Sequence, residues 1–262
     1  MLCLHGFPEF WYTWRYQLRY FNKSYRVIAV DMRGYGDSSK PKGYQNYKLD
    51  IVVDDIIATI GALGHKSAII MAHDWGGVVA WRLAVRRPDL VGKLIQINSP
   101  HSKVYNELLK NPVQRKRSWY LFMFQCPFLP EIYIKAGDYK WPKNVFRSSE
   151  TGIKNKENFT EEDMKAWMYT YSRPGSLTPP INYYRAAMRQ FRPTPFPNEL
   201  IQPKTLLIWS EEDAFLVNEA ADLTVPLCQE IVLKKLKNAS HWAHQDCPEL
   251  VNQYIEEFLK QS

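Results

Sequence analysis

The sequence predicts an α/β fold, in which a mostly parallel sheet is flanked by helices and carries a helical insertion. Three observations predict this fold. In residues 1–100, short apolar runs of strand length alternate with helical patterns, as they do in βαβ units. Residues 101–200 are rich in Pro and aromatic residues and contain no clear strand pattern. The alternation then returns in residues 201–262, so that one sheet is interrupted and afterwards completed.

The first hundred residues supply most of the predicted sheet. The predicted strands are 1–5, 25–30, 67–73 and 92–98, and the predicted helices are 11–21, 49–63 and 75–87. The second helix stops at Gly64, which suits the left-handed conformation at a helix C-terminus. The third helix stops before Pro88, which cannot continue it.

The remaining elements define the expected domain organisation. Residues 205–209 and 230–233 are predicted strands, and residues 217–223 and 248–259 are predicted helices. We therefore expect residues 1–100 and 201–262 to form one core, since 262 residues suit a single α/β domain. Residues 101–200 are expected to form a mostly helical cap, or lid, over the sheet.

The positive charge is confined to that middle segment. Residues 101–200 hold 16 Lys and Arg against 9 Asp and Glu, which accounts for the whole net charge of +7. No basic run, recognition-helix pattern or zinc spacing accompanies the charge, so no nucleic-acid partner is expected. A solvated face is one interpretation, and attraction to anionic lipids or to carboxylate-bearing substrates is the other.

The sequence contains no sign of a metal site or cofactor. Its four cysteines are far apart and form no CxxC pair, so neither a disulfide scaffold nor a zinc site is expected. No signal peptide is visible, and the apolar runs are too short to span a bilayer. The 14% aromatic content supplies rings to line an apolar pocket.

Asp74 is the predicted nucleophile. It stands in the turn Ala72-His73-Asp74-Trp75-Gly76-Gly77, which follows a strand and opens a helix, as a nucleophile elbow does. Small residues two positions before and after the centre allow the sharp turn. No GxSxG pattern occurs in the chain, so a serine esterase or lipase is not expected. The alternative is that Asp74 is only a helix N-cap.

Two backbone amides are predicted to form an oxyanion hole. The segment Leu4-His5-Gly6-Phe7-Pro8 lies where the first strand ends. An amide from this loop and the amide after the nucleophile are expected to hold a developing negative charge, which assigns the N–H groups of Phe7 and Trp75.

An acid and a histidine should follow the nucleophile in that chain order. Asp213 follows the strand 205–209, with Glu211 and Glu212 as rivals for the role of the acid. His241 follows the strand 230–233, and His244 is its neighbour. The order and spacing favour Asp213 and His241 over solvated loop residues.

These motifs together carry a resemblance to a known family. HGFPEFWYTWRYQ, DMRGYGDSS, HDWGG, SEEDAF and ASHW resemble the epoxide hydrolase family of the α/β hydrolase fold, in particular its membrane-anchored, epoxide hydrolase 4-like members. The resemblance implies an apolar epoxide substrate, such as a lipid epoxide, a covalent ester on Asp74 and a vicinal diol product. It also implies two cap tyrosines that donate to the epoxide oxygen. Residue-by-residue matching assigns these two roles to Tyr120 and to Tyr184. It does not select Tyr183, the neighbour of Tyr184.

Two other functions stay open at this stage. The HDWGG motif is shared with haloalkane dehalogenases, which would need a halide-binding Trp or Asn in place of the tyrosine pair. A catalytically idle relative that acts as a binding protein is the other alternative.

The family pattern also implies features that this sequence lacks. Ala72 stands where the family elbow usually has Gly, a change of one methyl group. A pair of strands normally precedes the strand before HGFP, so we expect those strands to be missing and the strand 25–30 to become a sheet edge. By the resemblance, an upstream membrane anchor and an endoplasmic-reticulum or other membrane-associated location are expected. The sequence gives no oligomeric state.

Overall fold

The computed structural model describes residues 1–189 and 200–261. Among these residues, six strands form one sheet in the order β2-β1-β3-β4-β5-β6, and all neighbouring strands are parallel. The strands are β1 (Leu2–Leu4), β2 (Ile28–Val30), β3 (Ala68–His73), β4 (Val91–Ile97), β5 (Thr205–Ser210) and β6 (Ile231–Leu236). The predicted α/β fold with a parallel sheet is confirmed.

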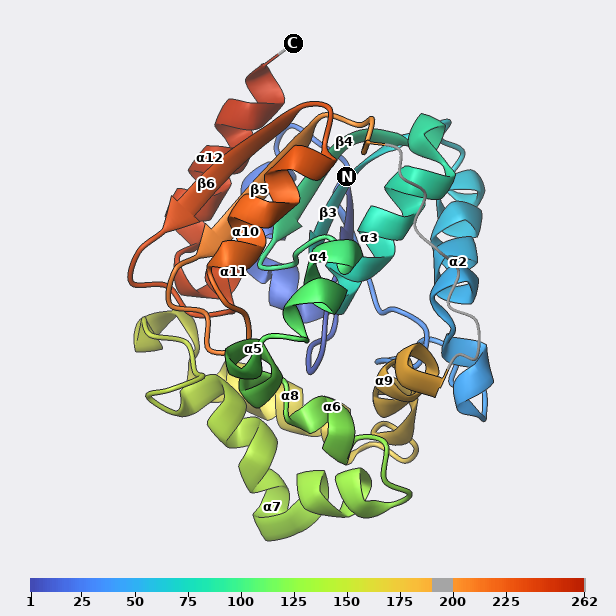
Figure 1. Cartoon of the computed structure of the whole chain (residues 1–262), viewed down its shortest axis with the longest axis vertical. Helices are drawn as coiled ribbons and strands as arrows, with labels where there is room; N and C mark the ends of the chain where they lie inside the picture. Colours follow the sequence, from blue (N-terminus) through green and yellow to red (C-terminus); the bar gives the residue numbers. More distant parts are fainter. Residues whose placement is uncertain (190–199, 262) are drawn as a thin grey trace.

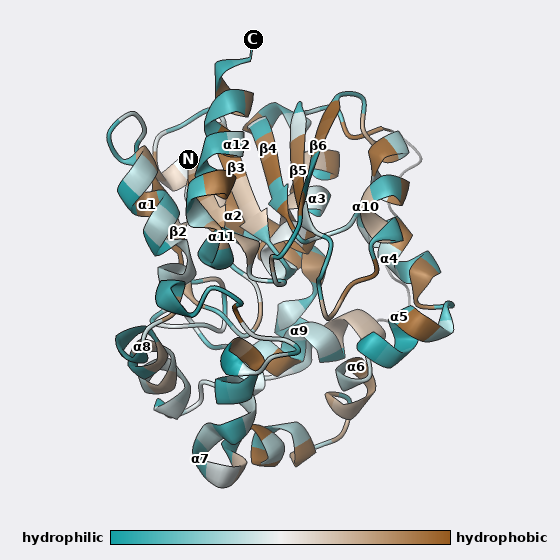
Figure 2. Ribbon diagram, turned by 90° about the vertical axis from the view of Figure 1, so that its left-hand side faces the viewer, coloured by the Kyte–Doolittle hydropathy of each residue, from teal (hydrophilic) through white to brown (hydrophobic). Residues whose placement is uncertain are grey.

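Helices cover both faces of the sheet (Figures 1 and 2). These are α1 (Arg15–Phe21), α2 (Leu49–Ala62), α3 (Trp75–Arg86), α10 (Glu219–Thr224), α11 (Ala243–Asp246) and α12 (Pro248–Lys260). Short 3₁₀-helices lie at Trp11–Trp14, Tyr44–Tyr47, Pro88–Leu90, Lys156–Asn158 and Val225–Leu227. Strands β1 and β5 are apolar along most of their length, as expected for a parallel sheet buried between helices, whereas the edge strand β6 also carries two lysines.

The two faces of the sheet bury different residues, because successive side chains of a strand point in opposite directions. Cys3 and Met71 pack in one cluster with residues of α1 and α12, such as Phe21 and Ile255. Leu4 and the other alternate residues of β1 and β3 pack in a second cluster with α2 and α3. The sheet is thereby fixed between two apolar layers.

In the described part of the chain, six α-helices lie between β4 and β5, and we call them the inserted helices. They are α4 (Ser102–Leu108), α5 (Pro112–Arg117), α6 (Tyr120–Met123), α7 (Leu129–Arg147), α8 (Glu161–Ser172) and α9 (Thr178–Arg189). They gather beyond the end of the sheet that is opposite the C-terminus (Figure 1). No strand occurs between residues 101 and 189, as predicted, while residues 190–199 of the predicted cap lie outside the described residues.

Several element boundaries differ from the prediction. The predicted strand 25–30 shortens to β2, which is an edge of the sheet as expected. The predicted helix 11–21 divides into a 3₁₀-helix and α1. Gly64 has a φ of +76° and ends α2 as expected. None of the helices within 1–189 and 200–261 has the length and apolarity needed to cross a bilayer.

Hydrogen bonds join the inserted helices to the loops of the sheet. The Trp167 ring N–H on α8 donates to the Pro8 carbonyl at 3.1 Å, and the Tyr171 hydroxyl donates to the same oxygen. The backbone N–H groups of Lys154 and Asn155 donate to the Asp246 carboxylate at 3.1 and 2.8 Å. The inserted helices are therefore held at the carboxyl ends of the strands.

Candidate active site

Asp74 lies in a tight turn between β3 and α3. Its φ of +49° is strained for a residue with a side chain, which is a common feature of functional sites. A Cβ on Gly76 would come within 2.1 Å of the Leu4 carbonyl oxygen, and one on Gly77 within 2.3 Å of the Ser99 side chain. The turn therefore requires its small residues, and the Asp74 side chain lines a cavity instead of packing in the core.

The loop after β1 lies against Asp74, because β1 and β3 are neighbours with Leu4 paired to Ala72. The Phe7 backbone N–H donates to Asp74 Oδ1 at 2.7 Å. Trp75 is the first residue of α3, so its N–H has no partner within the helix. Of the two amides predicted for the oxyanion hole, that of Phe7 thus contacts the Asp74 carboxylate, and that of Trp75 follows Asp74 directly in the chain.

His241 lies between two carboxylates. Its Nδ1 is 2.6 Å from Asp213 Oδ2, and its Nε2 is 3.8 Å from Asp74 Oδ2. Asp213 Oδ1 accepts the backbone N–H groups of Phe215 and Leu216 at 2.7 and 3.0 Å. These bonds fix the Asp213 carboxylate, which in turn orients the imidazole toward Asp74.

The rival residues lie elsewhere. Glu212 is exposed and pairs with Lys154, so it does not contact His241. The His244 ring nitrogen Nε2 lies 2.6 Å from the Thr13 hydroxyl, in a separate buried cluster. The structure therefore brings together Asp74, Asp213 and His241 from the ends of three strands.

The electrostatics of His241 are set by its two acidic neighbours. Burial opposes the charged ring, but the Asp213 charge and hydrogen bond, together with Asp74, raise the pKa of His241 to about 10. Burial also opposes the charge of Asp213, yet the interactions with His241 lower the pKa of Asp213 below its usual value. The resting site thus holds an imidazolium between two carboxylates.

Sequence reasoning missed Asn98. This residue follows β4 with a φ of +43°, and its side-chain amide donates to Asp213 Oδ2 at 2.6 Å. Its amide oxygen accepts the Ser210 hydroxyl at 3.1 Å. The position of Asn98 at a strand end was the available signal, but no motif singled it out.

The two predicted tyrosines lie on the inserted helices, opposite Asp74. Tyr120 begins α6 and Tyr184 lies in α9, with their ring centres 5.9 Å apart. Both line the same cavity as Asp74 and His241, and Tyr183 lines it as well. The Tyr183 hydroxyl donates to the Arg33 carbonyl at 2.7 Å. Tyr184, unlike Tyr183, also lines the smaller cavity beside Asp74.

Both tyrosines remain protonated over the ordinary pH range. Burial, and secondarily the charge of Asp74, raises the pKa of Tyr184 well above its usual value. Burial, followed by Tyr105 and then by Asp74, does the same to the pKa of Tyr120. Two O–H donors are therefore kept next to one carboxylate, which suits a substrate whose oxygen gains negative charge.

Two cavities of unequal size meet at these residues. The larger has a volume of about 430 Å³ and the smaller about 30 Å³. Their shared lining residues are Asp74, Tyr120, Tyr184, Phe215 and His241. Asp74 thus borders both a large and a small cavity.

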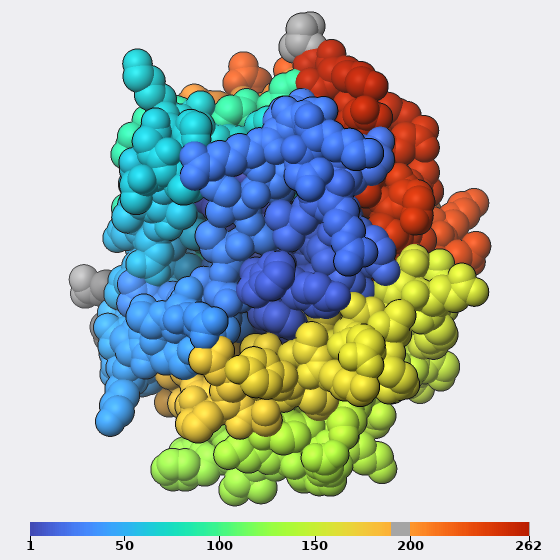
Figure 3. All heavy atoms as spheres, turned by 180° about the vertical axis from the view of Figure 1, so that it is seen from behind, coloured from blue at the N-terminus to red at the C-terminus, as the bar shows by residue number. Residues whose placement is uncertain are grey.

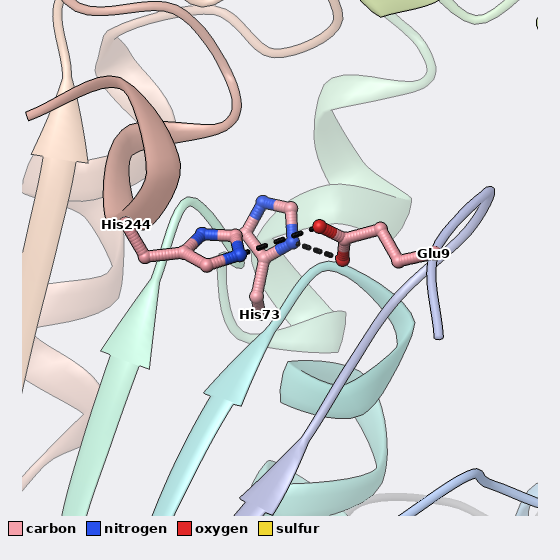
Figure 4. Close-up of side chains that lie close together, drawn as sticks. All are labelled: Glu9, His73 and His244. Carbon is pink, nitrogen blue, oxygen red and sulfur yellow. Dashed lines mark hydrogen bonds and ion pairs between the residues drawn. The ribbon is translucent and has the colours of Figure 1, made fainter. Parts of the chain in front are cut away.

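A buried cluster of Glu9, His73 and His244 lies behind the site (Figure 4). The ring nitrogens of His73 face Glu9 Oε2 at 2.7 Å and the His241 carbonyl at 3.0 Å. Burial would raise the pKa of Glu9, but its histidine neighbours hold that pKa well below the usual value. Residue types and distances would suit a cation, yet hydrogen bonds already satisfy the Glu9 carboxylate, which also accepts the Gly6 N–H and the Thr13 hydroxyl.

The comparisons with known proteins agree with this geometry. A family model described as alpha/beta hydrolase fold matches residues 1–248. Epoxide hydrolase 4 of Homo sapiens is 45% identical over 100% of this chain and 72% of its own length. Epoxide hydrolase 2 of Caenorhabditis elegans is 42% identical over 100% of this chain and 74% of its own length. The chain belongs to the epoxide hydrolase family of the α/β hydrolase fold.

The solved structure of an epoxide hydrolase supports the same family assignment. The crystal structure of the Bacillus megaterium epoxide hydrolase in complex with an inhibitor matches with a TM-score of 0.90 and 32% identity, over 100% of this chain and 93% of that chain. The predicted resemblance to the epoxide hydrolase family is therefore confirmed. An aspartate nucleophile is typical of epoxide hydrolases of this fold, and in this chain Asp74 occupies the elbow.

Proposed function

We propose that this chain hydrolyses epoxides to vicinal diols through a covalent ester on Asp74. The observation that carries the proposal is the pairing of a carboxylate with two protonated tyrosines in one cavity. An epoxide has a poor leaving alkoxide, so its opening needs a nucleophile on one side and proton donors on the other. Asp74, Tyr120 and Tyr184 supply both.

The first step forms the ester. Asp74 Oδ2 attacks an epoxide carbon, the carbon–oxygen bond breaks, and the departing oxygen receives hydrogen bonds and then a proton from the tyrosine side. Asp74 Oδ1, which the Phe7 N–H holds at 2.7 Å, becomes the carbonyl oxygen of the ester. The geometry of the resting carboxylate thus suggests which oxygen reacts.

The second step breaks the ester. Conversion of Asp74 to an ester removes one of the two negative charges that raise the pKa of His241, so the imidazolium loses its proton more readily. This proton balances the one taken up by the alkoxide. Neutral His241 then accepts a proton from water, which attacks the ester carbonyl, while the Phe7 and Trp75 N–H groups stabilise the oxyanion. The intermediate collapses when the bond between the Asp74 carbonyl carbon and the diol oxygen breaks, and that oxygen takes the proton from His241. The diol leaves, and transfer of the new Asp74 carboxyl proton to His241 restores the carboxylate and the imidazolium.

The inserted helices are proposed to act as a cap on a core of residues 1–100 and 201–262. The cap would comprise residues 101–200, as predicted, apart from residues 190–199, which lie outside the described part of the chain. Tyr120 and Tyr184 would be the catalytic contribution of the cap, and the sheet would contribute the other groups.

The substrate we infer is an apolar epoxide. The cavity of about 430 Å³ has room for a long apolar group, as in a lipid epoxide. A haloalkane is less suited to the site, because two O–H donors match a developing alkoxide better than a halide.

His241→Gln tests this function directly. The variant should form the ester but not hydrolyse it, so incubation with an epoxide should raise the protein mass by the mass of the substrate, on the peptide that contains Asp74. Asp74→Ala is the matched control and should show no increase. Unchanged turnover by His241→Gln would contradict the role of His241, and halide release from haloalkanes with no epoxide turnover would favour a dehalogenase.

A further inference from the structure

An exposed apolar surface covers α5, α6 and the start of α7. It is formed by Val113, Trp119, Phe122, Phe128, Leu129 and Ile132, and we call it the apolar surface. Phe128 is 78% exposed, Ile132 63% and Phe122 52%. Single exposed apolar residues are ordinary, but six within positions 113–132 are a concentration of the kind that marks an interaction site.

The apolar surface lies toward one end of the molecule. Helix α7 forms the end farthest from the C-terminus, with α6 and α5 between it and the sheet, and the view from behind shows the residues of α7 at that end (Figures 1 and 3). A planar partner could therefore approach this end without meeting the helices that flank the sheet.

Unpaired cations surround the apolar surface. Arg115, Lys116, Lys135 and Lys140 are exposed, and none of them forms an ion pair within 1–189 and 200–261. The two acidic residues between positions 110 and 140 are Glu131 and Asp138. Each is already paired with a base of the inserted helices, so the field at this end is positive.

We propose that the apolar surface and its cations bind the surface of an anionic lipid bilayer. Apolar side chains flanked by lysine and arginine are the features by which peripheral proteins insert into the headgroup region of such a bilayer. A second copy of this chain fits less well, because a two-fold contact would place the same cations opposite each other.

The position of α6 connects the proposed docking to the cavity. Tyr120 and Leu121 line the large cavity, whereas Trp119 and Phe122 on the same short helix are exposed. A bilayer in contact with Trp119 and Phe122 would lie one helix away from Asp74. If the proposed function holds, apolar epoxides would reach the site from the lipid phase; the docking itself does not depend on catalysis.

Vesicle co-sedimentation of the full chain tests the proposal. Vesicles of phosphatidylcholine mixed with phosphatidylserine should bind the native chain more strongly than vesicles of phosphatidylcholine alone, and added salt should weaken the binding. Phe128→Ser with Ile132→Ser should lower the partition coefficient at least roughly tenfold. Lys116→Gln with Lys135→Gln should lower it roughly tenfold to thirtyfold on the mixed vesicles only.

Two control variants test whether the loss of binding is specific to the apolar surface and its cations. They remove exposed apolar residues or cations elsewhere on the molecule. Leu223→Ser with Leu250→Ser removes exposed apolar residues outside that surface, and Lys23→Gln with Lys66→Gln removes exposed cations outside it. Both control variants should bind vesicles as the native chain does. Turnover of a water-dissolved epoxide by all four variants should stay at the native level.

Three outcomes would overturn the proposal. The first is equal, weak binding of the native chain to both kinds of vesicle. The second is native-like binding by the Phe128→Ser, Ile132→Ser variant. The third is a native chain that is dimeric in vesicle-free buffer and becomes monomeric in that variant, which would show that a second copy covers the apolar surface.

Discussion

The ends of the sheet and the inserted helices contribute different groups to one site. The sheet places charged groups: Asp74 follows β3, Asp213 follows β5 and His241 follows β6, each near the carboxyl end of a strand. The inserted helices place neutral donors, Tyr120 on α6 and Tyr184 on α9. Under the proposed mechanism, ester formation needs both regions, whereas ester hydrolysis needs only the groups of the sheet.

The two regions also differ in how their side chains are fixed. Backbone N–H groups and Asn98 hold the Asp213 carboxylate, and the Phe7 N–H holds Asp74. The tyrosines are held by ring contacts with other apolar side chains, among them Phe124, whose ring centre is 4.9 Å from that of Tyr184. The comparison suggests that the charged groups tolerate little displacement, while the donors follow the packing of their helices.

Asp74→Ala should have the largest effect. The sheet would lose the only group that forms the ester, so epoxide turnover should fall by at least ~10⁴-fold. Steady-state assays of diol formation measure this loss, and thermal unfolding serves as the control for folding. Turnover within tenfold of the native rate would remove Asp74 from the mechanism.

Replacing both tyrosines should separate the contribution of the inserted helices from that of the sheet. Tyr120→Phe with Tyr184→Phe should slow ester formation by about 10²–10³-fold for each lost donor. Hydrolysis of an ester already formed should keep its native rate, since the tyrosines are absent from that step. Single-turnover kinetics with rapid quenching separates the two rates, and Tyr183→Phe is the matched control. An equal loss in both steps would mean that the tyrosines only support the fold of the site.

The pH dependence of stability should reveal the charge of His241. Its pKa is raised to about 10 in the folded chain, whereas an unfolded histidine titrates near ~6.5. The contribution of the His241 charge to the stability of the folded chain is therefore complete below about pH 6.5 and is lost as the pH rises toward 10. The Tm difference between the native chain and His241→Gln should narrow by several degrees over that range.

The exposed His65 provides a matched substitution. His65→Gln controls for the removal of a histidine from the surface of the folded chain. A constant Tm difference between the native chain and His241→Gln would contradict an imidazolium held between two carboxylates.

The sequence predicted the parts of the site that local patterns define. Strand length, apolar runs and the turn around Asp74 are properties of neighbouring residues, so the order of the elements and the elbow could be read directly. Chain order left Glu212 as a rival of Asp213, and the structure places Glu212 in an exposed pair with Lys154. The parallel sheet, the fold and the family are confirmed.

Contacts between distant segments could not be read in the same way. Asn98 bonds to Asp213 across 115 positions of the chain, and His73 bonds to the His241 carbonyl across 168. No local pattern predicts such a partner, because the partner is chosen by sheet order. The strand before Asp31 was predicted too long for a similar reason: Tyr25 and Val27 are apolar residues that pack with α1 and are not paired with β1.

A single turnover in water labelled with heavy oxygen tests the central claim most directly. With enzyme in excess over epoxide, a diol formed through the Asp74 ester takes its new oxygen from the carboxylate, so the diol should be unlabelled and the Asp74 peptide should gain one heavy oxygen. Direct attack of water activated by His241 would instead put the label into the diol and none into Asp74, and that result would contradict the account.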